Sequence, residues 1–169
     1  TLEDGTIPDY RDADRQWFYF QDYCEGESYI DGIIRTKKRR EGATSQATAS
    51  IALDAITIKK AFCGIISKTG QDAKDAFLKM IVPGIRSLPV FLKPRMEDEN
   101  PKTELIFQEP KSRKRVTEKR RGQLFDASLG LGSRISFRNT ELNSFDSGRL
   151  TKALIDEGGK FPAEVPVNQ

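Results

Sequence analysis

The sequence predicts an α/β domain with a largely parallel sheet flanked by helices. Apolar segments of strand length alternate along the chain with segments whose apolar residues recur at helical spacing, as in strand–helix–strand units. One strand, residues 61–66, is continuously apolar, as expected of a parallel strand buried on both faces. A chain of 169 residues is long enough to bury roughly 70% of the surface that its unfolded state exposes.

The first part of the chain predicts a helical lead-in followed by a strand and a helix. Residues 1–29 are rich in acidic and aromatic residues, and we expect them to form a mostly helical segment that packs on a core formed by residues 30–169. Residues 30–35 contain three isoleucines and predict a strand. From Thr44 onward the pattern predicts a well-buried helix, with Ile51 and Ala55 on its apolar side.

A second helix is expected after the strand at 61–66. Thr69 is a good N-cap, and Asp72 follows three residues later. Apolar residues continue at helical spacing to Ile81, where Pro83 and Gly84 are expected to end the helix. We expect residues 87–94, which are bounded by prolines, to be extended.

The last part of the chain predicts a hairpin and a final strand. Residues 105–107 and 135–137 are the two strands of a long hairpin, with a basic segment between them. Residues 152–155 form a short apolar strand that ends in two carboxylates, Asp156 and Glu157.

The amino-acid composition excludes several kinds of catalytic and metal-binding site. The chain has no histidine, which excludes Ser-His-Asp and Cys-His catalysis and histidine-ligated zinc within these residues. Cys24 and Cys63 are too few for a four-cysteine cluster and suit a reducing compartment, and the apolar run around Cys63 favours a core role. No apolar run approaches the roughly 20 residues that span a bilayer. Carboxylates, hydroxyls, Lys, Arg and a hard metal remain as reactive groups.

Positive charge is concentrated in two segments. The net charge is +3, but residues 35–41 hold five basic residues and one acid, and residues 111–121 hold seven and one. The rest of the chain is therefore acidic, and the pattern indicates local anion sites. The segment 111–121 can contact DNA phosphates, although a solvated tip is the alternative.

The loop between residues 35 and 44 has the features of a phosphate site. A strand–loop–helix junction directs backbone N–H groups and a helix N-terminus toward one point. Against the pattern G-x-x-x-x-G-K-[ST], Gly42 takes the second glycine and Thr44 the hydroxyl, while Ala43 replaces the lysine and Lys37 the first glycine. A solvated basic turn is the alternative interpretation.

The acid pair after the last strand complements this loop. Ligands of parallel α/β sheets bind at the carboxyl ends of the strands, where Asp156 is expected. Asp156 and Thr44 could then share a Mg²⁺ ion, and Glu157 could orient and deprotonate a water molecule. An aromatic wall for adenine could come from Trp17 and Tyr10 and a polar partner from Gln16, with ordinary packing as the alternative.

The segment Lys37-x-x-Arg40-x-Gly42-x-Thr44 resembles the deviant phosphate loop of large terminase subunits, the ATP-driven motors that package DNA in tailed bacteriophages. The segment Leu154-Ile155-Asp156-Glu157 resembles the Walker B strand of that family with its catalytic glutamate. Further similarity lies in residues 30–34, 64–73 and 134–149. The resemblance implies a P-loop NTPase fold of the RecA/ASCE type that carries a long basic hairpin.

The resemblance also implies roles for single residues. Lys37 and Arg40 would act on the β- and γ-phosphates, Glu157 would be the general base, and Thr44 and Asp156 would hold Mg²⁺. The expected ATP-binding residues are Lys37, Lys38, Arg39, Arg40, Glu41, Gly42, Ala43, Thr44 and Ser45, joined by Gln16 and Trp17. Since Lys37 and Lys38 are adjacent, either can be the displaced lysine.

At the level of the whole protein, the resemblance implies a viral packaging ATPase that moves double-stranded DNA into the procapsid. Its partners would be DNA, the portal protein and the small terminase subunit, within a homo-oligomeric ring in the cytoplasm of the infected host. We expect the chain, which runs from Thr1 to Gln169, to be part of a longer protein whose nuclease domain lies outside it. A helicase-like ATPase and a non-enzymatic nucleic-acid-binding module are the alternatives.

Overall fold

The computed structural model describes residues 9–38, 41–108, 131–139, 141, 145 and 148–161. The chain divides into two compact units, residues 1–46 and 47–169, and each is described by itself. The first unit contains helix α1 (Asp12–Gly26), which confirms the helical lead-in. Helix α2 (Ala43–Thr57) begins in the first unit and continues into the second.

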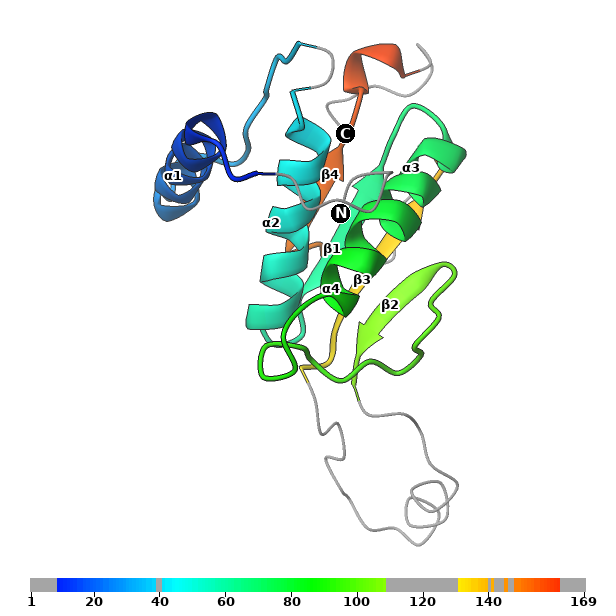
Figure 1. The fold of residues 1–169 in the computed structure, drawn as a ribbon. Coiled ribbons are helices and arrows are strands. Elements are labelled where there is room, and N and C mark those ends of the chain that lie inside the picture. The colour runs from blue at the N-terminus through cyan, green and yellow to red at the C-terminus, as the bar shows by residue number, and fades with distance from the viewer. Residues whose placement is uncertain are drawn as a thin grey trace, which may run out of the picture. The chain divides into compact units, whose positions relative to one another are not determined.

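The second unit is built on a mixed, mostly parallel sheet (Figure 1). Within the described residues its strand order is β2-β3-β1-β4, and the strands are β1 (Phe62–Ile66), β2 (Glu104–Phe107), β3 (Ser133–Arg138) and β4 (Lys152–Ile155). The central strand β1 is parallel to both β3 and β4, while β2 is antiparallel to β3. The expected α/β class with a largely parallel sheet flanked by helices is therefore confirmed.

Alternation along β1 separates the two faces of the sheet. Cys63 and Ile65 are fully buried in the core that the sheet forms with the helices. Gly64 points to the other face, where the side chains of Phe145 and Leu150 approach it closely. The core includes Ile51 from α2, so the apolar stripe expected of this helix is confirmed at that position.

The helix that follows β1 confirms its predicted start but not its predicted end. Thr69 caps α3 (Gly70–Ala76) and accepts a hydrogen bond from the Asp72 N–H at 3.2 Å. The chain then continues through the π-helical turn η1 (Phe77–Ile81) into α4 (Val82–Arg86), so Pro83 does not end it. Pro83 lies at the start of α4, where its missing N–H is tolerated, and the π-helical turn directly precedes it.

Two further expectations are wrong. Residues 30–35 form no strand: within the described part of the first unit no strand is present to pair with them, and Ile34 is 98% exposed. The backbone N–H and C=O groups of an extended segment without a neighbouring strand form hydrogen bonds with water instead of with another strand. Residues 87–94 contain a turn, in which the N–H groups of Leu92 and Lys93 donate to the Pro89 carbonyl.

The hairpin pairing is confirmed, since Leu105 lies opposite Ile135 in the antiparallel β2–β3 pair. Its basic segment, residues 111–121, lies outside the described residues. The final strand β4 is also confirmed, and Lys152 on it pairs with Asp54 of α2 at 2.8 Å. Among the described residues, no helix is long and apolar enough to cross a membrane.

Candidate functional site

The loop before α2 is shaped by Gly42, which has a φ of 80°. This left-handed conformation favours glycine, and it turns the chain directly into the helix. The Gly42 carbonyl accepts the first helical hydrogen bond, from the Gln46 N–H at 3.0 Å. The N–H groups of the first turn of α2 have no partner within the helix, which makes this end electropositive.

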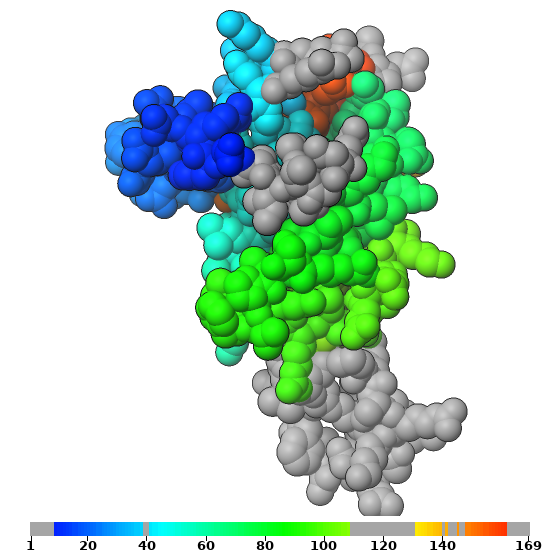
Figure 2. Space-filling model, viewed as in Figure 1, coloured from blue at the N-terminus to red at the C-terminus, as the bar shows by residue number. Residues whose placement is uncertain are grey.

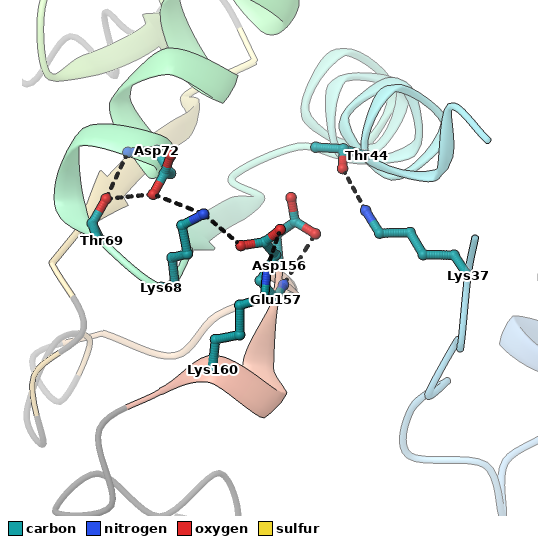
Figure 3. Close-up of polar contacts among 8 residues, drawn as sticks. All are labelled: Lys37, Thr44, Lys68, Thr69, Asp72, Asp156, Glu157 and Lys160. Atoms are coloured by element: carbon teal, nitrogen blue, oxygen red, sulfur yellow. Dashed lines mark hydrogen bonds and ion pairs between the residues drawn. The ribbon is translucent and has the colours of Figure 1, made fainter. Parts of the chain in front are cut away.

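The side chain of Lys37 reaches the start of α2, where its Nζ donates to Thr44 Oγ1 at 2.8 Å (Figure 3). Lys38 instead engages the loop through its backbone, and its N–H donates to the Glu41 carboxylate at 3.2 Å. Of the two adjacent lysines, Lys37 is therefore the one whose ammonium group contacts the hydroxyl of Thr44, the expected metal ligand.

Arg11, the N-cap residue of α1, braces this loop within the first unit. The Arg11 guanidinium donates to the Glu41 carbonyl at 2.9 Å and also pairs with Asp14 at 2.9 Å. The hydrogen bonds from Arg11 and Gln46 hold the pKa of the Asp14 carboxyl well below its usual range. Gln46 is itself bonded to Arg35, so a chain of polar contacts joins both sides of the loop.

The expected adenine-binding residues are also in the first unit. Trp17 is half-buried, and the Arg35 guanidinium lies 4.0 Å from the centroid of its ring. Gln16 is exposed on the same helix. The Arg35 guanidinium thus occupies one face of the Trp17 ring in this structure, by a cation–π contact. A role for Trp17 in adenine binding stays a prediction.

The remaining loop residues are placed only in part. Ala43 is buried and Ser45 is exposed in the first turn of α2. Arg39 and Arg40, which were expected to bind the phosphates, lie outside the described residues.

The acid pair lies where β4 ends, in the second unit. The Asp156 N–H donates to the Ile66 carbonyl at 2.9 Å, which extends the pairing of β4 with β1 by one residue. Glu157 follows with a φ of 53°, an unusual left-handed conformation for a residue with a side chain. Its N–H donates to Asp156 Oδ1 at 3.1 Å.

Two lysines converge on Glu157 (Figure 3). Lys68 Nζ lies 2.8 Å from Glu157 Oε2, and Lys160 Nζ lies 3.2 Å from Oε1. The contacts with Lys68 and Lys160 lower the pKa of the Glu157 carboxyl, and the contact with Glu157 raises the pKa of the Lys68 ammonium. Glu157 is therefore held in its ionised form.

Lys68 was not among the residues expected at the site. The pairing register of β1 and β4 would have predicted its position, because Ile66 lies opposite Ile155 in this parallel pair. Lys68 and Glu157 each follow these residues by two positions. Neighbouring parallel strands thus deliver both side chains to the same edge of the sheet.

The donor set permits a magnesium ion but does not form a cage for one. Within the described part of the chain, no cluster of three or more His, Cys, Asp or Glu side chains could hold a metal ion. Asp156 is half-buried and offers carboxylate oxygens, the ligand type that Mg²⁺ prefers. Because Mg²⁺ is usually held by one or two carboxylates together with substrate phosphates and water, a single carboxylate such as that of Asp156 fits this mode of binding.

No protein-family model matches the chain, and no curated protein matches it significantly.

Proposed function

We propose that the chain is a magnesium-dependent ATP hydrolase, the ATPase part of a viral DNA-packaging motor. The observation that carries this proposal is the contact between Lys37 and Thr44 at the start of α2. A cation, a hydroxyl and an electropositive helix end are there brought together, and these three groups suit the phosphates of a nucleotide and its metal.

In this proposal the loop binds the triphosphate. The backbone N–H groups at the start of α2 and the Lys37 ammonium take phosphate oxygens, and Arg40 adds a second positive charge. Thr44 and Asp156 are the residues that would hold Mg²⁺, and the Thr44 hydroxyl would then give up its bond to Lys37. The ion would supply positive charge beside the β- and γ-phosphates.

Hydrolysis then needs an oriented water molecule. Glu157 orients this water and accepts one of its protons as the water oxygen bonds to the γ-phosphorus and the bond to the ADP oxygen breaks, giving ADP and inorganic phosphate. The lysine contacts favour the orienting role, because a lowered pKa keeps Glu157 ionised but weakens it as a proton acceptor.

The packaging function rests on the resemblance to large terminase subunits together with the charge pattern. The basic residues of segment 111–121 would contact the phosphates of double-stranded DNA. By the same resemblance, the working assembly would be a ring of copies at the procapsid portal, in contact with the portal protein and the small terminase subunit.

Nucleotide binding is tested by thermal unfolding with a slowly hydrolysed ATP analogue, with and without Mg²⁺. A ligand at about 100 times its Kd stabilises the folded state by about 2.7 kcal/mol. We expect this stabilisation in the wild type, a loss of at least about tenfold in affinity in Lys37→Met, and little change in Lys38→Met, which is the matched control. A larger effect in Lys38→Met would show that the other lysine binds the phosphates.

Hydrolysis is tested separately with Glu157→Gln, which keeps the size of the side chain. We expect the variant to bind the ATP analogue as the wild type does, and its rate of ATP hydrolysis to fall by roughly 10²-fold or more. The rates are measured in the full-length protein. A chain that binds DNA in a salt-sensitive way but is not stabilised by any nucleotide would support the nucleic-acid-binding module instead.

A further inference from the structure

One charged side chain of α1 is buried, although most of the helix is exposed. The blue segment of Figure 2, which includes α1, presents most of its side chains at the surface, and of this helix only Asp14 and Cys24 are buried. Asp14 is 8% exposed. Since a carboxylate is rarely buried unless it is paired and hydrogen-bonded, the partners of Asp14 indicate what it does.

Both oxygens of the Asp14 carboxylate accept hydrogen bonds. The Arg11 guanidinium donates to Oδ2 at 2.9 Å and to Oδ1 at 3.0 Å, which makes a two-bond ion pair. The Arg11 backbone N–H also donates to Oδ2 at 2.9 Å, at the start of α1. The fourth bond comes from the side-chain amide of Gln46, which lies 32 residues later in the chain and donates to Oδ1.

Arg11 and Gln46 connect Asp14 to the loop before α2 at three places. Arg11 donates to the Glu41 carbonyl at 2.9 Å, at the turn that leads into α2. Gln46 is buried in the first turn of α2, and its side-chain oxygen accepts a hydrogen bond from the Arg35 guanidinium at the other end of the loop. The entry, the turn and the exit of the loop are therefore each linked to one carboxylate by two or three hydrogen bonds in sequence.

A helix cap is the alternative role of Asp14. An acid in the first turn stabilises a helix through the N-cap backbone and the helix dipole. That role needs only the bond from the Arg11 N–H. It does not account for the bond between Asp14 and Gln46 or for the bond between Arg11 and Glu41, because neither of these bonds lies within α1.

We propose that Asp14 is a positioning residue for the loop before α2, and that it holds this loop, through Arg11 and Gln46, in its binding conformation before a nucleotide arrives. The proposal rests on the proposed ATPase function and adds a residue that acts through others. A loop that is already ordered loses little conformational entropy on binding, so its affinity is higher than that of a mobile loop. Asp14 should therefore set the affinity for nucleotide and leave the rate of hydrolysis at saturating ATP unchanged.

The variant Asp14→Asn tests this role, because it keeps the size of the side chain and removes its charge. The amide replaces one acceptor oxygen with a donor, so at least one bond from Arg11 or Gln46 is lost. Asp12→Asn is the matched control. Asp12 lies in the same helical turn, its side chain is 84% exposed, and it forms an ion pair with Arg15 at 3.0 Å.

An exchange of side chains tests whether Asp14 acts through Gln46. Gln46→Glu alone sets two carboxylates against each other, which is unfavourable. In the double variant, Asp14→Asn with Gln46→Glu, the amide and the carboxylate change places, and the carboxylate at position 46 can also pair with Arg35. The loop of the double variant should therefore be closer to that of the wild type than the loop of Gln46→Glu is.

The first measurement is amide hydrogen exchange of the nucleotide-free protein, followed residue by residue by NMR. The Gln46 N–H, which donates to the Gly42 carbonyl at 3.0 Å, reports on the start of α2. We expect this N–H to exchange at least about tenfold faster in Asp14→Asn than in the wild type or in Asp12→Asn. Exchange in β1 should stay unchanged, because this strand belongs to the second unit.

The second measurement separates binding from chemistry. The Kd for a slowly hydrolysed ATP analogue with Mg²⁺ should rise at least about tenfold in Asp14→Asn. In the full-length protein, kcat at saturating ATP should stay within about twofold of the wild-type value. If Asp14 only capped α1, its loss would speed exchange within α1 and leave the Kd as in the wild type.

Three results would each overturn the proposal: unchanged exchange at Gln46 in Asp14→Asn, an unchanged Kd in that variant, or a double variant no closer to the wild type than Gln46→Glu. If thermal unfolding shows that Asp14→Asn does not fold, Gln46→Met carries the same test, because it leaves the pair of Arg11 and Asp14 intact. A wild type that binds no nucleotide would refute the ATPase function, and the exchange measurement would still decide whether Asp14 holds the loop.

Discussion

At the scale of single residues, the environment of Glu157 decides what it can do. A carboxylate after an apolar strand is common in α/β proteins, but here a left-handed turn and two ammonium groups fix it. Lys68 follows the end of β1, and Lys160 lies in the 3-10 turn (Gly158–Lys160) that follows β4, so the position of Glu157 depends on both segments.

The change Lys68→Met should raise the pKa of Glu157 toward its ordinary value of 4.5, because the cation that most favours the ionised form is removed. A group with a lowered pKa stabilises the fold above its unfolded-state pKa, and this contribution disappears as pH falls through its folded-state pKa. The variant should therefore lose stability at pH 7 and little or none at pH 2.

Carbon-detected NMR titration of labelled glutamate measures the pKa, and thermal unfolding at the two pH values measures the stability. Lys74→Met removes a comparable exposed cation that has no contact with Glu157, and it should leave the Glu157 titration unchanged. A Glu157 pKa that stays the same in Lys68→Met would contradict the assigned ion pair.

At the scale of elements, the side chains of Phe145 and Leu150 pack closely against β1 at Gly64, on the face of the sheet opposite to Cys63 and Ile65. A Cβ atom on Gly64 would lie 2.8 Å from the Phe145 ring and 3.1 Å from Leu150. Neither distance is compatible with ordinary packing. In contrast, a Cβ atom on Gly84, within α4, would meet nothing within 4 Å.

The two glycines therefore predict opposite effects of the same substitution. Gly64→Ala should destabilise the second unit by about 1–3 kcal/mol through overpacking. Gly84→Ala should stabilise it by about 0.5–1 kcal/mol, since alanine loses less conformational entropy than glycine in a helix. Denaturant unfolding of both variants measures the difference. Equal effects would show that Phe145 does not pack on β1.

At the scale of the whole molecule, the basic segment 111–121 lies between two paired strands in the sequence. The pairing of β2 with β3 brings Phe107 opposite Ser133, at the point where the chain leaves for segment 111–121 and returns. The strands on either side carry the buried residues, among them Leu105 and Ile135. The fold of the second unit thus has its core contacts on either side of this segment.

Replacing Lys111–Arg121 with a short Gly-Ser linker should leave the thermal transition unchanged and weaken binding to duplex DNA. If all seven basic residues contact phosphates, the slope of log Kobs against log salt should become less negative by about 6. Filter binding at several salt concentrations gives the slope. A fall in the thermal transition would mean that the segment packs on the body of the unit.

Much of this architecture follows from local sequence. The N-cap at Thr69, the apolar period of α2 and the apolar run of β1 depend on residues near one another in the chain, so the sequence predicts them correctly. The β2–β3 pairing also follows, since two strands flank one polar segment. Lys37 and Thr44, seven residues apart, meet for the same local reason.

Only the tertiary structure decided the rest. Residues 30–35 have the composition of a strand, but a strand also needs a neighbour to take its hydrogen bonds, and composition does not supply one. The helix passes through Pro83 because the π-helical turn before it rearranges the backbone pairing, which no local propensity reports. Lys68 meets Glu157 only because β1 and β4 pair in parallel, 89 residues apart in sequence. Contacts of this kind depend on which strands become neighbours, and that choice is made by burying the whole core at once.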